Sequence, residues 1–418
     1  MKDTTLALCI PTYKRPEAIR EFLDAEAKIL KNHLVDLVIV DSSPDGKTSD
    51  LVEDFIKSGF GNISYCRVDE NISSNEKFFW IYQNYSDKYD YIWITHDHTL
   101  YNEESIEYIL NVLDNHADFI FLKAQCPEFK NYETKDLCDF FYDSAWLLGK
   151  MGASIVKTSS FLNGVDWEKV KEKYLTPQKI NFSHVGFYFE RAAQMNDFTA
   201  VTIEIPTDYF LDLYRNRKLS WENEAVRICT QCWGSVISEL PDKYTNKMET
   251  IQSIDPYFLT AYKLIEYRKC GCYSWLDFLK YHKWIKLVFP YLYKDAGIIA
   301  LLPMKYLISK YSKGYSEKIA DCRRQGKKIC VYGAGKHAHE SIDFFTGVGI
   351  EIDAVLVTDK RGNVDKLCDI LVYDAKEYIE NNDVFVVVAV AGVGRDGITH
   401  YLEELKKNVN IQLSYCYF

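Results

Sequence analysis

Polar and charged residues follow three of the apolar runs in the first hundred residues of the chain. One run leads into Pro11-Thr12-Tyr13-Lys14-Arg15, another into Asp41-Ser42-Ser43, and a third into His96-Asp97-His98. A carboxylate after the second of these runs could accept hydrogen bonds from the imide of a uracil ring or from a ribose hydroxyl. A carboxylate after the last run could hold a divalent cation against a diphosphate. An aspartate at a strand end is common by itself, so the evidence lies in the order of the segments.

The elements that must position these residues alternate between strand and helix. The expected strands are Leu6–Ile10, Asp36–Asp41, Ile63–Val68 and Tyr89–Thr95, and the expected helices are Arg15–Leu30, Ser49–Ser58 and Asn75–Tyr85. Short apolar strands separated by helices favour a doubly wound, mostly parallel sheet in an α/β fold. Ligands of such sheets bind outside the carboxyl ends of the strands. The loops Pro11–Arg15, Asp41–Gly46 and His96–Thr99 therefore fall where a binding site is expected.

The composition is typical of a soluble globular protein. The chain has 418 residues, enough for two domains, and its 47% apolar and 26% charged residues exclude disorder and fibrous repeats. The net charge is −10, which argues against a dedicated nucleic-acid binder because such proteins carry a basic face. We therefore expect no nucleic-acid partner.

Three further features concern the cellular compartment. The 12 cysteines are scattered along the chain, without the dense spacing of a secreted disulfide scaffold. Met1–Thr5 leads straight into an apolar strand and shows no cleavage-site pattern of a signal peptide. The apolar stretch Ala296–Met304 has about half the length needed to span a bilayer. We expect a cytoplasmic protein with reduced thiols.

The segments Ile10-Pro11-Thr12-Tyr13-Lys14-Arg15 and Val38-Ile39-Val40-Asp41-Ser42-Ser43 resemble motifs of glycosyltransferase family 2, whose members have the GT-A fold. The resemblance covers roughly the first 250 residues and is strongest over the first hundred. It implies an enzyme of hexosyltransferase type that transfers a sugar, with inversion, from a nucleotide-diphospho-sugar to a hydroxyl. A UDP-sugar is the expected donor.

The resemblance also implies residue roles. The nucleotide-sugar pocket would be formed by Pro11, Thr12, Tyr13, Arg15, Asp41, Ser43, Lys77, His96 and Asp97. Asp41 would face the base, and Lys14 or Arg15 would lie near the phosphates. The family usually has Asn-x-Gly after the third strand, whereas this chain has Asn71-Ile72-Ser73 and lacks the glycine. The prediction that Lys77 contacts the diphosphate therefore rests on a segment that departs from the family pattern.

The motif after the fourth strand departs further from the family. Members normally carry Asp-x-Asp, whose last acid binds manganese or magnesium, whereas this chain has His96-Asp97-His98. Hard cations prefer carboxylate oxygens, and imidazole suits manganese better. Asp97, with His98 or His96 as its partner, is the expected ligand of Mn²⁺ or Mg²⁺. The alternative is a site without metal, in which cationic side chains neutralise the leaving diphosphate.

Inverting transfer needs a general base that takes the proton of the acceptor hydroxyl. Family members supply an acid at the start of a helix that corresponds to the segment ending at Arg191. Ser183 is expected to be the N-cap of this helix, which places His184 in the first turn. The base is then His184 or, further along, Glu190. An ordinary surface histidine on a capped helix is the alternative.

A second α/β pattern begins after Gly314. Strand Lys328–Tyr332 leads into Gly333-x-Gly335-x-x-Ala338 and a helix, and further strands are expected at Ile352–Val357 and Val384–Val390. The segment resembles the small Rossmann-like domains of sugar acyltransferases and other polysaccharide-synthesis proteins. Gly333, Gly335 and Lys336 would form a second nucleotide site, although a purely structural glycine turn is the alternative.

Between the two patterns lies a basic and aromatic helical segment that Pro290 and Pro303 interrupt. Lysines such as Lys283, Lys286 and Lys294 alternate with aromatic residues, as in helices that lie on anionic membranes. The alternative is a linker that packs its aromatic residues against the catalytic domain. The expected domains are a GT-A domain at 1–256, this helical linker at 257–313 and a Rossmann-like domain at 314–418.

The cysteine pairs Cys229/Cys232 and Cys270/Cys272 each supply half of a zinc pattern. The first pair lies in an expected helix, Glu224–Ser238, where cysteines commonly pack as small apolar residues. We favour packing over zinc for these pairs.

The sequence as a whole predicts a glycosyltransferase of bacterial surface polysaccharide or glycoconjugate synthesis. The acceptor would be a saccharide or a lipid-linked or protein-linked glycan, and the enzyme would work in the cytoplasm or at the inner face of the membrane. The alternative function is a catalytically silent subunit that binds a sugar nucleotide within a glycosyltransferase complex, because His96-Asp97-His98 has lost acidic residues.

Overall fold

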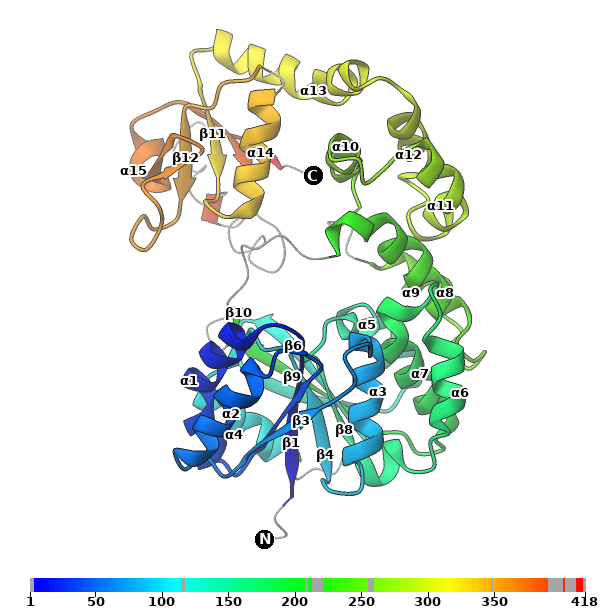
Figure 1. Cartoon of the computed structure of the whole chain (residues 1–418). Coiled ribbons are helices and arrows are strands. Elements are labelled where there is room, and N and C mark those ends of the chain that lie inside the picture. Colours follow the sequence, from blue (N-terminus) through cyan, green and yellow to red (C-terminus); the bar gives the residue numbers. More distant parts are fainter. Residues whose placement is uncertain are drawn as a thin grey trace. The chain divides into compact units, whose positions relative to one another are not determined.

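The computed structural model of the chain describes residues 4–113, 117–206, 210–212, 221–254, 259–347, 349–389, 401–402 and 411–415. These residues form two compact units (Figure 1). Unit one comprises Met1–Arg215 and Arg227–Asp255, and unit two comprises Asn216–Val226 and Pro256–Phe418. Residues 1–3, part of the segment compared with a signal peptide, and residues 256–257, at the predicted domain boundary, lie outside the described part.

Unit one is built on a sheet of eight strands in the order β3-β2-β1-β4-β8-β6-β9-β7. Its strands are β1 (Leu6–Thr12), β2 (Asp36–Asp41), β3 (Ile63–Arg67), β4 (Tyr91–Ile94), β6 (Phe119–Cys126), β7 (Lys130–Thr134), β8 (Ser154–Lys157) and β9 (Ala200–Pro206). Strands β3, β2, β1 and β4 are parallel neighbours, whereas β8 runs antiparallel to β4 and β6. This confirms the expected α/β class with a mostly parallel sheet.

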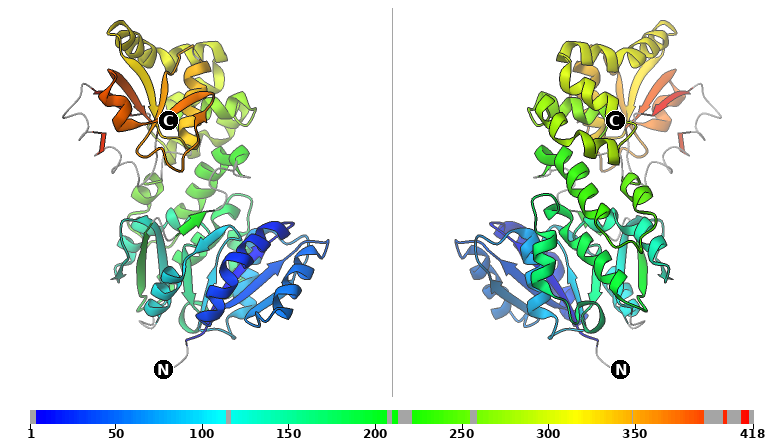
Figure 2. Two further views of the ribbon diagram at one scale, coloured as in Figure 1. Left: turned by 90° about the vertical axis from the view of Figure 1, so that its left-hand side faces the viewer. Right: turned by 90° about the vertical axis from the view of Figure 1, so that its right-hand side faces the viewer.

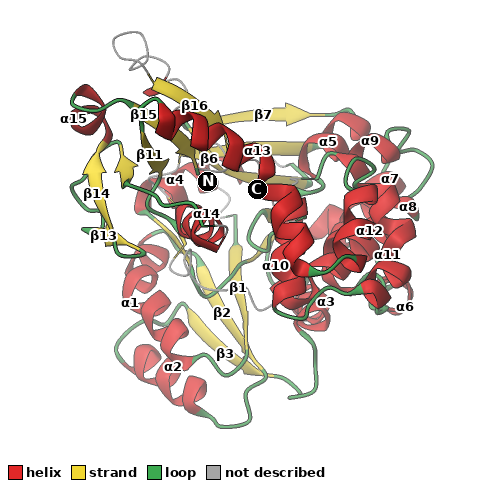
Figure 3. Ribbon diagram, turned by 90° about the horizontal axis from the view of Figure 1, so that it is seen from above, coloured by secondary structure: helices red, strands yellow, loops and turns green. Residues whose placement is uncertain are grey.

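Helices cover both faces of this sheet, which explains why β1 and β2 are apolar along almost their whole length. The helices of unit one are α1 (Pro16–Asn32), α2 (Lys47–Lys57), α3 (Ser74–Tyr85), α4 (Glu103–Leu113), α5 (Leu137–Ser144), α6 (Trp167–Tyr174), α7 (Ser183–Gln194), α8 (Trp233–Ser238) and α9 (Lys247–Gln252). Figure 3 shows α1 and α2 next to each other along β1, β2 and β3. Helix α3 contacts β1, and α6 and α7 pack on α3.

Two short elements complete unit one. Strand β5 (Thr99–Tyr101) directly follows the histidine-containing loop and pairs with β10 (Phe210–Asp212). The expected helix Glu224–Ser238 is instead a π-helical stretch, Arg227–Cys232, followed by α8. Cys229 and Cys232 are buried there.

Unit two contains a six-stranded sheet in the order β13-β14-β12-β11-β15-β16 (Figures 1 and 2). Its strands are β11 (Lys328–Tyr332), β12 (Ala354–Val357), β13 (Lys366–Leu367), β14 (Ile370–Asp374), β15 (Val384–Val388) and β16 (Ile411–Tyr415). All neighbouring pairs are parallel except β13 and β14, which form an antiparallel hairpin. Helices α14 (Lys336–Gly347) and α15 (Ala375–Glu380) follow β11 and β14 along the chain. The Rossmann-like assignment stays a prediction.

The rest of unit two is helical. Its helices are α10 (Ala261–Lys269), α11 (Trp275–Val288), α12 (Tyr293–Leu301) and α13 (Met304–Arg324). Helices α11 and α12 end just before Pro290 and Pro303, as expected, because proline lacks the amide proton that continues a helix. Among the described residues, no helix is long and apolar enough to cross a membrane.

Candidate active site

The carboxyl ends of β1, β2 and β4 lie side by side, as the sequence predicts. Thr12 pairs with Asp41 in the register of β1 and β2, and the amide of Ser42 donates to the carbonyl of Thr12 at 3.3 Å. On the other side of β1, the amide of Thr95 donates to the carbonyl of Cys9 at 3.0 Å. The three polar loops therefore share one edge of the sheet.

Asp41 is fully buried at this edge and is held by its own chain. Its Oδ1 accepts hydrogen bonds from the Ser43 amide at 2.8 Å and from the Ser43 hydroxyl at 2.6 Å. Its Oδ2 accepts a hydrogen bond from the Tyr65 hydroxyl at 3.0 Å. Burial and the negative charge of Asp41 together raise the pKa of Tyr65. Ser43 and Tyr65 therefore fix the orientation of the Asp41 carboxylate at this edge of the sheet.

Tyr65 is a residue of this cluster that the sequence reasoning missed. It lies on β3, opposite Ile39 of β2 in the parallel register. The sequence predicts both strands, and a pairing of β2 with β3 could have indicated that a side chain of β3 lies near Asp41. The sequence does not predict the register of β3 against β2, and it is this register that places Tyr65, rather than another residue of β3, beside Asp41.

Lys77 lies in the first turn of α3, and its ammonium reaches the carboxyl ends of β1 and β2. A capping box fixes the start of this helix, because Ser73 and Glu76 exchange side-chain and backbone hydrogen bonds. The Lys77 side chain is 2% exposed, and its ammonium donates to the Thr12 carbonyl at 2.5 Å and to the Ser42 hydroxyl at 2.8 Å. Burial lowers the pKa of Lys77 to about 8, although the charge of Asp41 opposes this shift. Its described bonds therefore join the ends of β1 and β2.

The turn after β1 presents Tyr13 and Arg15 at the surface of the site. Lys14, between them, has a left-handed backbone with φ of 52°, and its amide donates to the Ser43 hydroxyl at 2.6 Å. The Tyr13 ring is 45% exposed and lies 4.9 Å from the Lys14 ammonium. Pro11 is half-buried and Thr12 is buried, so these two residues shape the loop from beneath.

Asp97 forms the charged centre of the site. Its Oδ1 lies 2.8 Å from Nη1 of Arg15 and 3.2 Å from Nδ1 of His98. The side chain is 3% exposed, and its Oδ2 is buried with no hydrogen-bond partner within the described residues. A buried carboxylate oxygen without a partner is costly, so a group that binds there would be stabilising.

The two histidines flank this carboxylate. The His96 and His98 rings are stacked, with centroids 4.5 Å apart. Burial lowers the pKa of His96 well below its usual range, and the positive charges of His98 and Lys150 lower it further. His96 is therefore neutral at pH 7 and has a lone pair that a metal could take.

These residues offer donor types that Mn²⁺ takes, but the structure does not bring the three ligand atoms within 4.8 Å of one another as a metal-binding group. The Oδ2 of Asp97 and the ring nitrogens of His96 and His98 provide one oxygen and two nitrogen donors, a set that suits Mn²⁺ better than Mg²⁺. The Arg15 guanidinium already pairs with the other oxygen of Asp97, and its positive charge can take the place of part of a metal ion's charge. The ion pair of Arg15 with Asp97 supports the cationic alternative, and the metal site stays a prediction.

His184 lies in the first turn of α7, as predicted, but it is not on the surface. The side chain is 6% exposed, and its ring lies 5.0 Å from the ring of Phe78. Its Nε2 is 3.0 Å from the Leu148 carbonyl, and because a carbonyl only accepts, Nε2 carries the proton. The Nδ1 lone pair is then the ring's proton acceptor. Burial lowers the pKa of His184 to about 4, opposed by the backbone groups of Leu148 and Gly149.

Two expectations about this helix are wrong. The surface-histidine alternative fails because His184 is buried. Ser183 is not the N-cap, because its backbone is already helical and its hydroxyl donates to Oδ1 of Asn75 at 3.0 Å. The side chain that was expected to cap α7 instead joins it to α3.

Glu190, the other candidate base, makes different contacts. Its Oε2 lies 2.7 Å from the Lys173 ammonium and accepts a hydrogen bond from the Tyr174 hydroxyl. Both partners lie on α6 and neither is among the predicted site residues. The following residue, Arg191, donates to the carbonyls of Ser160 and Phe161. The described bonds of Glu190 therefore serve the packing of α7 on α6.

Unit one also contains a cavity, and unit two contains the predicted glycine loop. A cavity of about 520 Å³ in unit one is lined by residues of α5 and of the segment between α7 and β9, none of which was predicted as a site residue. In unit two, Gly333 follows β11 with φ of 115°, and its amide donates to the Leu356 carbonyl at 2.8 Å. Gly335 precedes α14, and a Cβ there would meet open space. The Lys336 side chain lies outside the described part.

Comparisons with known proteins agree with the arrangement of unit one. The sequence model of the family described as Glycosyl transferase family 2 matches residues 7–137. These residues contain the three polar loops and Lys77. No curated protein matches the chain in sequence.

The chain also has similarity to solved structures. Residues 1–349 of S. aureus TarS, in complex with UDP-GlcNAc, share 13% identity with a TM-score of 0.43, covering 75% of this chain and 92% of that one. The mannosyltransferase PcManGT from Pyrobaculum calidifontis, in complex with GDP-Man and Mn²⁺, shares 13% identity with a TM-score of 0.37, covering 75% of this chain and 87% of that one.

Proposed function

We propose that this chain, whose residues 7–137 match the sequence model of Glycosyl transferase family 2, transfers a sugar from a nucleotide-diphospho-sugar to an acceptor hydroxyl, with inversion. The observation that carries the proposal is Asp97, whose buried Oδ2 has no partner within the described residues while Arg15 neutralises its Oδ1. This is an arrangement for holding a diphosphate and its counter-ion at the carboxyl edge of a parallel sheet.

The donor would lie across the loops of β1, β2 and β4. The exposed ring of Tyr13 offers a face on which a base can stack, and Asp41 lies beneath with its oxygens oriented by Ser43 and Tyr65. The diphosphate would extend toward Arg15 and Asp97. A UDP-sugar suits this arrangement, because the imide of uracil donates and a carboxylate accepts.

The metal, when bound, would be Mn²⁺ or Mg²⁺ held by Asp97 with His98 or His96, and it would supply positive charge to the leaving diphosphate. The chain itself contributes Arg15, whose guanidinium is fixed by its ion pair with Asp97. Lys77 holds the ends of β1 and β2 together beneath the phosphates, which keeps the loop geometry rigid.

We assign the general base to His184 and keep Glu190 as the second choice. The Leu148 carbonyl fixes the tautomer with its proton on Nε2, which leaves Nδ1 to take the proton of the acceptor hydroxyl. The pKa of about 4 leaves the ring unprotonated at pH 7, but it also makes His184 a weaker base than an exposed histidine. The acceptor sugar would attack the anomeric carbon from the face opposite the nucleotide.

A screen of UDP-, GDP- and TDP-sugars tests the donor class. Binding would raise the unfolding temperature of the full chain, since a ligand of the folded state stabilises it, and release of nucleoside diphosphate would report turnover. We expect both signals with one nucleotide class. Failure of every nucleotide sugar to shift the unfolding temperature or to be turned over would contradict the proposal.

A silent sugar-nucleotide-binding subunit is the second candidate function. It is favoured by the replacement of the acidic motif with His96-Asp97-His98. Such a subunit would show the thermal shift without release of nucleoside diphosphate, with or without manganese. Turnover that disappears in Asp97→Ala would exclude it.

The acceptor is proposed to be a saccharide or a lipid-linked or protein-linked glycan of bacterial surface polysaccharide synthesis, met in the cytoplasm or at the inner face of the membrane.

Helix α11 supports a peripheral contact with anionic lipid. Four exposed side chains follow one another along this helix at intervals of three or four residues: Leu276, Leu279, Lys283 and Lys286. One face of the helix therefore carries two apolar side chains followed by two basic ones. Exposed Tyr291 follows this helix.

Co-sedimentation with anionic vesicles tests this contact. We expect binding at low salt, release at high salt, and loss of binding when Lys283, Lys286 and Lys294 are changed to Glu. A matched control changes Lys47, Lys57 and Lys169 of unit one to Glu. Equal binding by the two triple variants, or none by the wild type at low salt, would contradict the membrane contact.

A further inference from the structure

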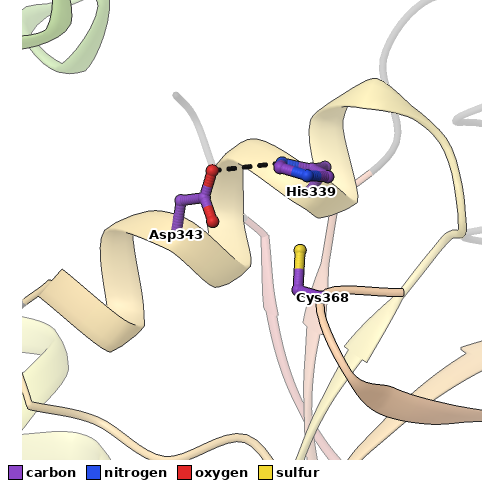
Figure 4. A group of neighbouring side chains, drawn as sticks. All are labelled: His339, Asp343 and Cys368. Atoms are coloured by element: carbon purple, nitrogen blue, oxygen red, sulfur yellow. Dashed lines mark ion pairs between the residues drawn. The ribbon is translucent and has the colours of Figure 1, made fainter. Parts of the chain in front are cut away.

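Three side chains with metal-binding atoms meet in unit two, on elements that carry no residue of the predicted donor site. His339 and Asp343 lie one turn apart on α14, and Cys368 lies in the turn between β13 and β14 (Figure 4). Their imidazole, carboxylate and thiol ligand atoms all lie within 4.8 Å of one another. The imidazole and carboxylate already form an ion pair of 3.1 Å between Nδ1 and Oδ2.

The turn that carries Cys368 has an unusual backbone. Leu367 pairs with Ile370 across the hairpin, so Cys368 and Asp369 alone form the turn. Their φ angles are 51° and 65°, the left-handed region that tight two-residue hairpins require and that Asn-Gly usually fills. A cysteine in this conformation costs free energy relative to the residues that favour it. The conformation holds the thiol at the helix face.

The donor set is specific in its chemistry. One thiolate, one imidazole and one carboxylate are the ligand types that zinc takes in proteins, whereas calcium and magnesium avoid sulfur. Donor atoms around tetrahedral zinc lie about 3.5 Å apart. Nδ1 of His339 and Oδ2 of Asp343 already lie 3.1 Å apart and every separation is within 4.8 Å, so a shift of roughly 1 Å or less would complete the arrangement. His339 and Asp343 are exposed and Cys368 is half-buried, which leaves their side chains room to rotate inward.

We propose that His339, Asp343 and Cys368 bind a zinc ion that joins α14 to the β13–β14 hairpin, with the fourth coordination position open to water. The two elements already pack together, because Leu367, Cys368 and Ile370 contact the core that contains Ala338 and Ile342. The ion replaces a weak surface ion pair with three coordinate bonds and cross-links segments about 25 residues apart. The site also lies beside the glycine loop, since the His339 amide donates to the Gly335 carbonyl.

This site is independent of the proposed sugar transfer. It uses no residue of the β1, β2 and β4 loops, and its ligands lie in unit two. A protein that failed to bind any sugar nucleotide would still be expected to bind zinc here.

Cobalt substitution tests the site in the full, reduced and metal-free chain. Co²⁺ bound through a cysteine gives a near-ultraviolet thiolate-to-cobalt charge-transfer band, and the titration counts equivalents. We expect one equivalent with this band, displaced by Zn²⁺. His339→Asn and Asp343→Asn should weaken cobalt binding by more than about 100-fold, because even loss of an outer partner of a ligand costs 10–100-fold.

A variant of Cys368 and a control variant of another cysteine decide the outcome. Cys368→Asn removes the thiolate but supplies a residue that favours the left-handed turn, so the hairpin is expected to fold. The control is Cys270→Ser, because the Cys270 and Cys272 sulfur atoms lie only 3.6 Å apart and form another candidate thiol site. The band should vanish in Cys368→Asn and persist in Cys270→Ser. A band that survives Cys368→Asn, or is missing in the wild type, would overturn the proposal.

Discussion

Burial shifts the pKa values of individual ionisable side chains in unit one. His184 and Glu26 are both almost inaccessible to water, yet burial shifts their pKa values in opposite directions because each neutral form is favoured. The two residues therefore predict opposite dependences of stability on pH. Each can be tested with a neutral substitution of similar size.

His184→Gln is expected to make stability less sensitive to acid. The pKa of His184 is about 4 when folded and 6.5 when unfolded, so the unfolded state binds more protons between these values and stability falls as the pH drops from 7 to 5. This residue contributes about 2 kcal/mol to that fall. Urea unfolding at both pH values should show a smaller fall for the variant than for the wild type, whereas a His282→Gln control should behave as the wild type. An unchanged fall in His184→Gln would contradict the assignment.

Glu26→Gln is expected to stabilise the protein at alkaline pH. Glu26 is 2% exposed on α1, its Oε1 accepts the Tyr101 amide at 2.8 Å, and burial raises its pKa from 4.5 to about 7. The folded state then binds more protons than the unfolded state between those values, so stability falls as the pH rises through them. At pH 8 the variant should exceed the wild type by about 3 kcal/mol, and at pH 5 by less than about 1 kcal/mol. A variant that gains nothing on going from pH 5 to pH 8 would refute the shift.

At the scale of elements, close packing between helices holds α7 and therefore His184 in place. A Cβ at Gly186 would lie 2.2 Å from Cε1 of Tyr174 on α6, so this position cannot take a side chain without moving the ring. Gly186→Ala should destabilise unit one by about 1–3 kcal/mol through overpacking. The control is Gly61→Ala, where a Cβ meets nothing within 4 Å. Chemical unfolding of both variants checks the difference, and equal stabilities would show that α6 yields freely.

The elements also show what could be predicted from the sequence. Strands β1, β2 and β4 were predictable because each is a short apolar run followed by a polar loop, and their parallel order then brought Asp41 and Asp97 to one edge. The antiparallel strand β8 was not predicted, since the segment around it has few turn residues. Ser183 was misread because its hydroxyl could satisfy either the helix amides or Asn75, and only packing decides between them.

For the whole molecule, the division into two compact units predicts separable thermal transitions. A nucleotide sugar with manganese should raise the transition of unit one, and Zn²⁺ should raise that of unit two, each by the free energy of binding. A ligand at 100 times its dissociation constant adds about 2.7 kcal/mol to the unit that binds it. Calorimetry of the full chain with each ligand alone measures the two shifts. Equal shifts of both transitions by either ligand would contradict independent binding.

The central claim is that Asp97 and Arg15 form the donor diphosphate site of a sugar transferase. The most direct test is the rate of nucleoside diphosphate release from the preferred donor, with and without manganese, by wild type, Asp97→Asn and the surface control Glu168→Gln. We expect Asp97→Asn to lower the rate by about 100-fold or more at every manganese concentration, because the charge that positions Arg15 is lost. Glu168→Gln should keep the wild-type rate. A wild-type rate in Asp97→Asn would contradict the account.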